Sequence, residues 1–269
     1  MFKIAKIQND KYYTSPELAQ YCVEKTKEII GVDNITEYIE PSAGAGAFLD
    51  YLDKPYLAYD IEPEDDRITQ ADWLSVNLDY KKGRCVIGNP PFGNRNILAT
   101  KFYKHAIKFG DYISFILPVS QYDNNQKMYE FDLIYTENLG FRDYSGINLN
   151  CAFNIYKRNS TGIRNKPIDY TLNDITVVEY RRGSKDVLPE KWEFAMCTWG
   201  DGSCGKKVIN SGTYAQEHYI ICNNAKFRDK LIEVCESTDW RHLCPSVSSA
   251  KLQTWRIYKY LKEQIPELE

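Results

Sequence analysis

The chain has 269 residues, and its 43% hydrophobic and 26% charged residues exclude a wholly disordered chain. At about 150 residues per domain, this length predicts one large domain or two modest ones. The net charge is −3 and the mean hydropathy is −0.51. No apolar run approaches the ~20 residues of a membrane helix, and the first residues lack the apolar core of a signal peptide. We therefore expect a soluble, cytoplasmic protein without membrane contact, nucleoid-associated if the source is bacterial.

Apolar periodicity and turn residues predict alternating helices and strands in the first part of the chain. The first element is a helix over 16–30, which begins at a proline and is followed by a glycine. A strand over 35–39 follows, and then a helix that starts at Phe48. The next elements are three strands, over 56–59, 68–72 and 84–88, and a helix over 97–109. A strand over 112–117, a helix over 126–138 and a strand over 149–156 complete the series. This alternation favours a parallel α/β sheet with helices on both faces.

The composition changes after residue 158, which we take as the end of a first domain, 1–158. Residues 159–269 then form a smaller α+β module, with strand-like runs in 168–180 and an amphipathic helix over about 250–264. The first domain has 18 basic and 22 acidic residues, and the second has 16 and 15. One locally basic stretch could contact nucleic-acid phosphates, or be an ordinary solvated face; its candidate residues are Arg164, Lys166, Arg181, Arg182 and Lys185.

The eight cysteines contain no CxxC pair and predict free thiols in a reducing compartment. A zinc site built from Cys197, Cys204, His218 and Cys222 remains open, but the spacing of these residues matches no common zinc framework. We therefore expect no metal.

A Gly/Ala-rich turn follows the first predicted strand and carries the first chemical signal, Glu-Pro-Ser-Ala-Gly-Ala-Gly-Ala-Phe at 40–48. Small residues let the backbone approach a ligand closely. A second strand ends about 20 residues later at Asp60, whose carboxylate could accept both hydroxyls of a ribose. Because the GxGxxG pattern of pyrophosphate binders is missing, an adenosine without a pyrophosphate fits this pair of features better than a dinucleotide.

The second signal is Asn-Pro-Pro-Phe-Gly at 89–93, directly after the fourth strand. Two prolines stiffen this loop and remove backbone donors, which leaves the Asn89 amide oxygen and the Pro90 carbonyl as acceptors. Two acceptors that bind the hydrogens of an aromatic amino group make its nitrogen more nucleophilic. Phe92 offers a face on which a flat base can stack.

The order of these motifs resembles that of amino-methyltransferases that use S-adenosylmethionine, most closely the gamma group of DNA adenine-N6 methyltransferases. The resemblance spans residues 12 to about 158 and implies a Rossmann-like class I methyltransferase sheet. It also implies that Asn89, Pro90 and Phe92 hold the target amine. The implied cofactor-binding residues are Thr14, Ser15, Pro41, Ser42, Gly44, Gly46, Asp60, Ile61, Asp72 and Trp73. Which of the two hydroxyls, Thr14 or Ser15, is used is left open. Ala99, Phe102 and Tyr103 would close the adenine pocket.

Members of that group stack a late aromatic residue on the flipped-out target base, and the candidates here are Phe141 and Tyr144, of which we prefer Tyr144. The implied reaction is methyl transfer to adenine N6 in DNA, with the second domain recognising the target. RNA adenine-N6, DNA cytosine-N4 and protein glutamine-N5 methylation, and a non-catalytic cofactor-binding scaffold, are the alternatives. A cognate restriction endonuclease is a possible partner, and we expect a monomer or weak dimer.

Overall fold

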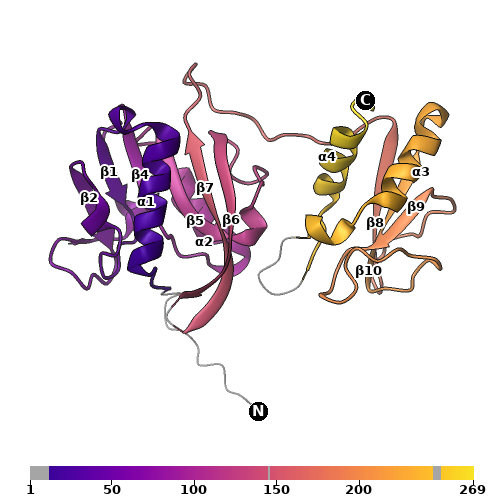
Figure 1. Ribbon diagram of the computed structural model, residues 1–269, viewed down its shortest axis with the longest axis horizontal. Helices are drawn as coiled ribbons and strands as arrows, with labels where there is room; N and C mark the ends of the chain where they lie inside the picture. Colours follow the sequence, from indigo (N-terminus) through magenta and orange to yellow (C-terminus); the bar gives the residue numbers. More distant parts are fainter. Residues whose placement is uncertain (1–11, 145, 245–249) are drawn as a thin grey trace, which may run out of the picture. The chain divides into compact units, whose positions relative to one another are not determined.

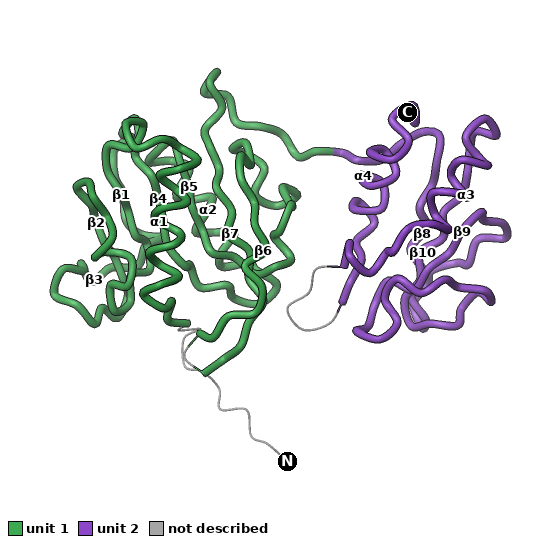
Figure 2. The backbone as a smooth tube through the Cα atoms, in the orientation of Figure 1, with its two compact units in different colours: residues 1–168 green, residues 169–269 purple. Residues whose placement is uncertain are grey.

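The protein is described by a computed structural model that covers residues 12–144, 146–244 and 250–269. The chain divides into two compact units, Met1–Ile168 and Asp169–Glu269, which are drawn in different colours in Figure 2. The division thus falls at residue 168, whereas the sequence suggested 158. No helix among the described residues is long and apolar enough to cross a membrane.

The first unit is built on a seven-stranded sheet with the order β3-β2-β1-β4-β5-β7-β6 (Figure 1). Neighbouring strands from β3 to β5 are parallel, whereas β7 is antiparallel to both β5 and β6. The strands are β1 (Glu37–Glu40), β2 (Tyr56–Asp60), β3 (Thr69–Gln70), β4 (Arg84–Gly88), β5 (Tyr112–Pro118), β6 (Asp132–Tyr144) and β7 (Ile147–Lys157). The strand order reverses between β1 and β4, so their carboxyl ends flank the crevice where open α/β sheets bind ligands.

Two helices cover opposite faces of this sheet, α1 (Pro16–Ile30) and α2 (Ile97–Ala106). On β4, Cys85 and Ile87 lie in the hydrophobic cluster of α1, whereas Val86 between them lies in the cluster of α2. Alternate side chains of a strand point to opposite faces, so the sheet is buried on both sides. The unit also contains the short 3-10 helices η2 (Val32–Asn34), η3 (Leu49–Tyr51), η4 (Trp73–Ser75), η5 (Asn94–Asn96) and η6 (Val119–Gln121).

Most predicted elements of this unit are confirmed, and two predicted helices are wrong. Residues 126–131 form no helix, and 132–138 belong to the long strand β6. After Phe48 the chain makes only the short turn η3. The overall prediction of a Rossmann-like α/β sheet with helices on both faces is confirmed.

The second unit is a three-stranded antiparallel sheet with two helices, which agrees with the predicted α+β module. The sheet has the order β8-β10-β9, and β10 pairs with both neighbours. Its elements are β8 (Ile175–Arg181), β9 (Phe194–Cys197), β10 (Gln216–Cys222), η7 (Ala225–Phe227), α3 (Arg228–Ser237), η8 (Trp240–Leu243) and α4 (Thr254–Gln264).

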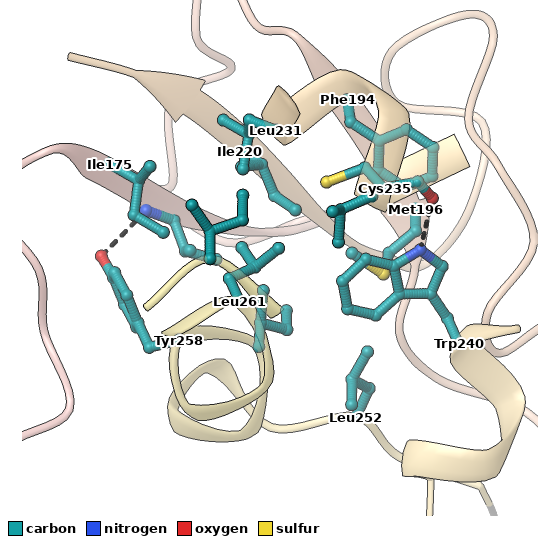
Figure 3. Close-up of a cluster of buried hydrophobic side chains, with 14 of the residues drawn as sticks. Ile175, Phe194, Met196, Ile220, Leu231, Cys235, Trp240, Leu252, Tyr258 and Leu261 are labelled. Atoms are coloured by element: carbon teal, nitrogen blue, oxygen red, sulfur yellow. Dashed lines mark hydrogen bonds between the residues drawn. The ribbon is translucent and has the colours of Figure 1, made fainter. Parts of the chain in front are cut away.

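The core of the second unit brings side chains of the sheet together with those of α3, η8 and α4 (Figure 3). Trp240 lies at its centre and donates its indole N–H to the carbonyl of Cys235 at 3.0 Å. The Tyr258 hydroxyl accepts the backbone N–H of Val177 at 2.9 Å. Both buried polar groups are thereby satisfied, which lets the aromatic rings fill the core without leaving an unpaired donor.

Candidate functional site

A cavity of about 610 Å³ lies in the first unit beside the carboxyl ends of β1, β2 and β4. Eight of the residues predicted from the sequence line it: Pro41, Ser42, Gly44, Asp60, Ile61, Asp72, Trp73 and Asn89. Phe102 of α2 lines it too, whereas Ala99 and Tyr103 are fully buried in the cluster behind it. The lining is completed by Tyr12, Tyr13, Ala71, Leu74, Pro91 and Leu98.

Asp60 holds together the two loops that form one wall of this cavity. Its Oδ2 accepts the backbone N–H of Gly44 at 2.8 Å, and its Oδ1 accepts that of Glu62, also at 2.8 Å. Each oxygen of an ionised carboxylate can accept a further bond. Asp60 therefore fixes the Gly/Ala-rich turn and retains the capacity to accept the hydroxyls of a ribose.

The two glycines of this turn have different environments. Both have positive φ, 53° at Gly44 and 79° at Gly46, which favours glycine. Gly44 lines the cavity, and a Cβ there would lie 3.8 Å from the ring of Tyr13. A Cβ at Gly46 would meet Asp65 at 3.2 Å, and Gly46 does not line the cavity. Its role is therefore to form the turn.

Ile61, Trp73 and Leu74 are apolar residues that line the cavity together with Asp60. Ile61 is 60% exposed and free to pack on a ring, whereas Trp73 is 1% exposed. Trp73 packs edge-on against His105 and Phe109 and forms a rigid wall. The Asp72 carboxylate accepts the N–H of Leu74 at 3.0 Å and caps η4. These groups would border the adenine of a bound adenosine.

Asn89 has a fixed orientation. Its Nδ2 donates to the carbonyl of Tyr12 and to Oγ1 of Thr14, both at 3.2 Å. Because a backbone carbonyl can only accept, the amide nitrogen must face Tyr12. The other end of the amide, Oδ1, is buried and has no hydrogen-bond partner among the described residues. Ser42 supports the same corner by donating its hydroxyl to the Asn89 carbonyl at 3.2 Å.

Pro90 and Phe92 lie next to this corner but do not line the cavity. Pro90 is buried, and Phe92 is half-buried. The ring of Phe92 stacks on that of Tyr12, with centroids 6.0 Å apart and planes inclined by 22°. A base that stacks on this face of Phe92 must therefore displace the Tyr12 ring.

The structure distinguishes the two hydroxyls that the sequence left open. Ser15 caps α1 by accepting the N–H of Leu18 at 3.3 Å, which is a role in helix stability. Thr14 bonds Asn89 instead. Neither residue lines the cavity.

Glu40, the last residue of β1, begins the first motif but does not line the cavity. It is 2% exposed, and its Oε2 has no hydrogen-bond partner among the described residues. Burial, and secondarily the negative charge of Asp60, raises the pKa of the Glu40 carboxyl well above its usual range. The Glu40 side chain also lies close to Gly88 at the end of β4, because a Cβ added at Gly88 would lie 3.3 Å from the Cγ of Glu40.

The preferred stacking residue, Tyr144, is placed where it does not fit that role. It is 1% exposed and packs in the cluster beneath α1, so its ring offers no open face. Phe141, the other candidate, is 63% exposed on the same strand. This is a correction to the preference stated above.

The five basic candidates do not belong to one unit. Arg164 and Lys166 are exposed residues of the first unit, whereas the other three are exposed residues of the second. Arg181 pairs with Glu179 at 2.8 Å on its own strand. Arg182 donates to the carbonyls of Gly212 and Thr213. Lys185 lies in the turn that follows.

The residues considered for zinc do not form a metal site within the described part of the chain. There, no group of three or more His, Cys, Asp or Glu side chains is arranged to hold a metal ion. Both ring nitrogens of His218 lie 2.7 Å from threonine hydroxyls, those of Thr198 and Thr254. His218 therefore has no ring nitrogen left for a ligand bond.

Comparison with known proteins agrees with these observations. Residues 53–164, which contain Asp60, Asp72 and Asn89, match a family described as the EDM2 methyltransferase-like domain. The search of curated protein sequences gave no match. The chain thus contains a methyltransferase-like domain, and S-adenosylmethionine is supported as its cofactor.

Solved structures with a similar fold include a Pyrococcus horikoshii protein proposed to be an RNA methyltransferase, with 16% identity, a TM-score of 0.46, and 58% of this chain and 90% of that chain covered. A Thermoplasma acidophilum protein has 19% identity, a TM-score of 0.44 and coverages of 58% and 93%. The methyltransferase subunit of a type I restriction-modification system from Streptococcus thermophilus has 13% identity, a TM-score of 0.42 and coverages of 56% and 46%. These likenesses are distant, and the fold assignment rests on the strand order and directions given above.

The cavity has the chemistry that S-adenosylmethionine requires. The Asp60 carboxylate would accept the ribose hydroxyls, Ile61 and Trp73 would border the adenine, and the turn at 41–46 would enclose the methionine end. Asn89 lines the cavity, and its buried Oδ1 is an acceptor that no donor within the described ranges satisfies. When bound, the cofactor would supply an electrophilic methyl group, and the residues that line the cavity would hold it.

Proposed function

We propose that this protein transfers a methyl group from S-adenosylmethionine to the N6 amino group of adenine in DNA. The observation that carries the proposal is the orientation of Asn89. Its amide nitrogen donates two hydrogen bonds, while its oxygen is buried and has no partner in the part of the chain that the structure describes. A buried acceptor without a donor costs about 1–3 kcal/mol. A primary amine on a ligand would remove that cost by donating a hydrogen to it.

The acceptor also explains how the amine becomes reactive. The lone pair of an amino group on an aromatic ring is delocalised into the ring, so the nitrogen is a poor nucleophile. Acceptors at Asn89 Oδ1 and the Pro90 carbonyl would bind its hydrogens and favour the tetrahedral nitrogen needed for attack. Such preorganised groups need no reorganisation during the reaction. The amine loses its proton after the methyl group has been added, so no strong base is required.

The target base would stack on Phe92, and it must leave the helix to do so because an amine inside the base stack cannot reach the cofactor. Its arrival would displace the ring of Tyr12 that now covers Phe92. Phe141, which is exposed, is the better candidate for a second contact than the buried Tyr144.

Recognition of DNA is proposed for the second unit. Arg181, Arg182 and Lys185 are exposed there and could neutralise phosphates. A restriction endonuclease that cleaves the same site is proposed as a partner in the cell.

The test is methyl transfer from methyl-labelled S-adenosylmethionine onto separate pools of DNA, RNA and protein, followed by nucleoside and amino-acid analysis. We expect label in N6-methyldeoxyadenosine. Label in N6-methyladenosine of RNA, in N4-methylcytosine or in methylglutamine would replace DNA adenine by that substrate. Cofactor binding without transfer to any pool would contradict an enzymatic function.

A further inference from the structure

The side-chain amide of Asn89 must be held in one of two orientations, because rotation by 180° exchanges its oxygen and its nitrogen. Only one orientation presents the oxygen acceptor that the proposed function requires. The structure shows two groups that hold one of them, each 3.2 Å from Nδ2: the Tyr12 carbonyl, which can only accept and so selects this orientation, and the Thr14 hydroxyl. Both belong to the segment that precedes α1, more than 70 residues away in the sequence.

We propose that Thr14 is a positioning residue for Asn89, and that its hydroxyl, together with the Tyr12 carbonyl, holds Asn89 Oδ1 toward the target amine. This inference rests on the proposed function, and it differs from the cofactor-binding role that the sequence resemblance implies for Thr14. Thr14 does not line the cavity, so a direct contact with the cofactor is not needed to explain its position.

The physical reason is that the two acceptors satisfy both hydrogens of one amide nitrogen. In the flipped orientation, Oδ1 would face the Tyr12 carbonyl oxygen, and the two oxygens would repel each other. The Thr14 hydroxyl alone could adapt to either orientation, because it can donate or accept. Its contribution in the observed orientation is to pair the second hydrogen, which keeps the amide plane fixed and leaves Oδ1 without a partner among residues 12–144, 146–244 and 250–269.

The test compares Thr14→Val, which keeps the shape but removes the hydroxyl, with Thr14→Ser, which keeps the hydroxyl. Thr36→Val is the matched control, since Thr36 is exposed at the opposite end of β1 and bonds the carbonyl of Lys82. For Thr14→Val we expect a roughly tenfold fall in kcat, equivalent to about 1.4 kcal/mol, with the cofactor dissociation constant unchanged by calorimetry. Thr14→Ser should restore kcat to within about threefold of the wild type, and Thr36→Val should leave it unchanged.

A second readout does not depend on catalysis. The side-chain amide signals of Asn89 can be recognised in the NMR spectrum of the ¹⁵N-labelled protein, because Asn89→Ala removes them. We expect Thr14→Val to shift these signals and to increase their exchange with solvent, whereas Thr14→Ser and Thr36→Val do not.

The outcomes separate the two hypotheses. If Thr14→Val weakens cofactor binding while kcat at saturating cofactor and the Asn89 signals stay unchanged, Thr14 is a cofactor contact and the positioning role is overturned. Equal losses in Thr14→Val and Thr14→Ser would also overturn it, because packing and not the hydroxyl would then be responsible. If the wild type transfers no methyl group to any substrate, the proposed function fails, and the NMR comparison still decides whether Thr14 orients Asn89.

Discussion

Replacing Asp60 by alanine should weaken cofactor binding more than any other single change in the wall of the cavity. The carboxylate accepts the N–H groups of Gly44 and Glu62 at 2.8 Å each, and so joins the turn at 41–46 to the loop after β2. The same oxygens face the place proposed for the ribose. Asp60→Ala therefore removes a ligand contact and the preorganisation of two loops at once.

The magnitude follows from these bonds. A hydrogen bond to a charged group contributes about 1.5–3 kcal/mol, which corresponds to roughly a tenfold to hundredfold loss of affinity for the ribose contact alone. The loss of loop order adds to this, so we expect the upper part of the range. The cofactor affinity of Asp60→Asn should lie between those of the wild type and Asp60→Ala, because the asparagine amide can accept from one of the two backbone N–H groups but not from both.

The assay is calorimetric titration of the full chain with S-adenosylmethionine, with circular dichroism to confirm folding. Asp66→Ala is the control, because Asp66 is an exposed carboxylate on the same loop. An Asp60→Ala protein that is folded and binds the cofactor with wild-type affinity would refute the placement of the ribose at Asp60.

Three further changes test other parts of the account. Ser15→Ala should lower the free energy of unfolding by about 1 kcal/mol in urea titration, with unchanged cofactor affinity, because Ser15 caps α1. Burial lowers the pKa of His218 to about 4 from its usual 6.5. The free energy of unfolding of the second unit should therefore fall by up to about 3 kcal/mol as the pH falls from 6.5 to 4, because protonation favours the unfolded chain. A His218→Gln protein that keeps this pH dependence would contradict the assignment. Arg182→Ala should reduce the slope of log K against log salt for DNA binding by about 0.9. Lys230→Ala, which removes a charge that pairs within α3, should leave the slope unchanged. Equal slopes in the wild type and both variants would place the phosphate contacts elsewhere.

Much of the sheet could be predicted because its central strands are short, apolar and followed by turn residues. The strand over 84–88 was predicted with the bounds that β4 has, and the acceptor-rich loop directly follows it. The positions of Asp60 and Asn89 at one edge follow from the parallel sheet, since carboxyl ends of parallel strands meet there.

The sequence predicts a helix over 126–138, where residues 132–138 belong to β6, because β6 is the edge strand of the sheet. Only one of its sides is paired, and most of its residues are exposed or half-buried, so the apolar alternation of a strand is weak. Its pairing with β7 also shifts register twice, between Leu133 and Tyr135 and between Asn138 and Gly140. Each shift changes which residues face the core, so counting along the sequence could not show that Tyr144 is buried and Phe141 exposed.

The contacts of the segment before α1 were also beyond the sequence. Nothing in the spacing of Tyr12, Thr14 and Asn89 indicates that the first two bond the third, because the approach depends on how α1 packs on the sheet. The resemblance pointed to a hydroxyl near the cofactor, and the structure instead shows which group each hydroxyl bonds.

The most direct test of the central claim is the single-turnover rate of methyl transfer by Asn89→Ala, measured beside its affinity for S-adenosylmethionine. The substitution removes the unpaired acceptor and leaves Asp60, Ile61 and Trp73 in place. We expect the rate on the substrate identified for the wild type to fall by about 10²–10³ or more, with cofactor affinity within about twofold of the wild type. A variant that transfers methyl groups at the wild-type rate would show that Asn89 is not the acceptor on which the reaction depends.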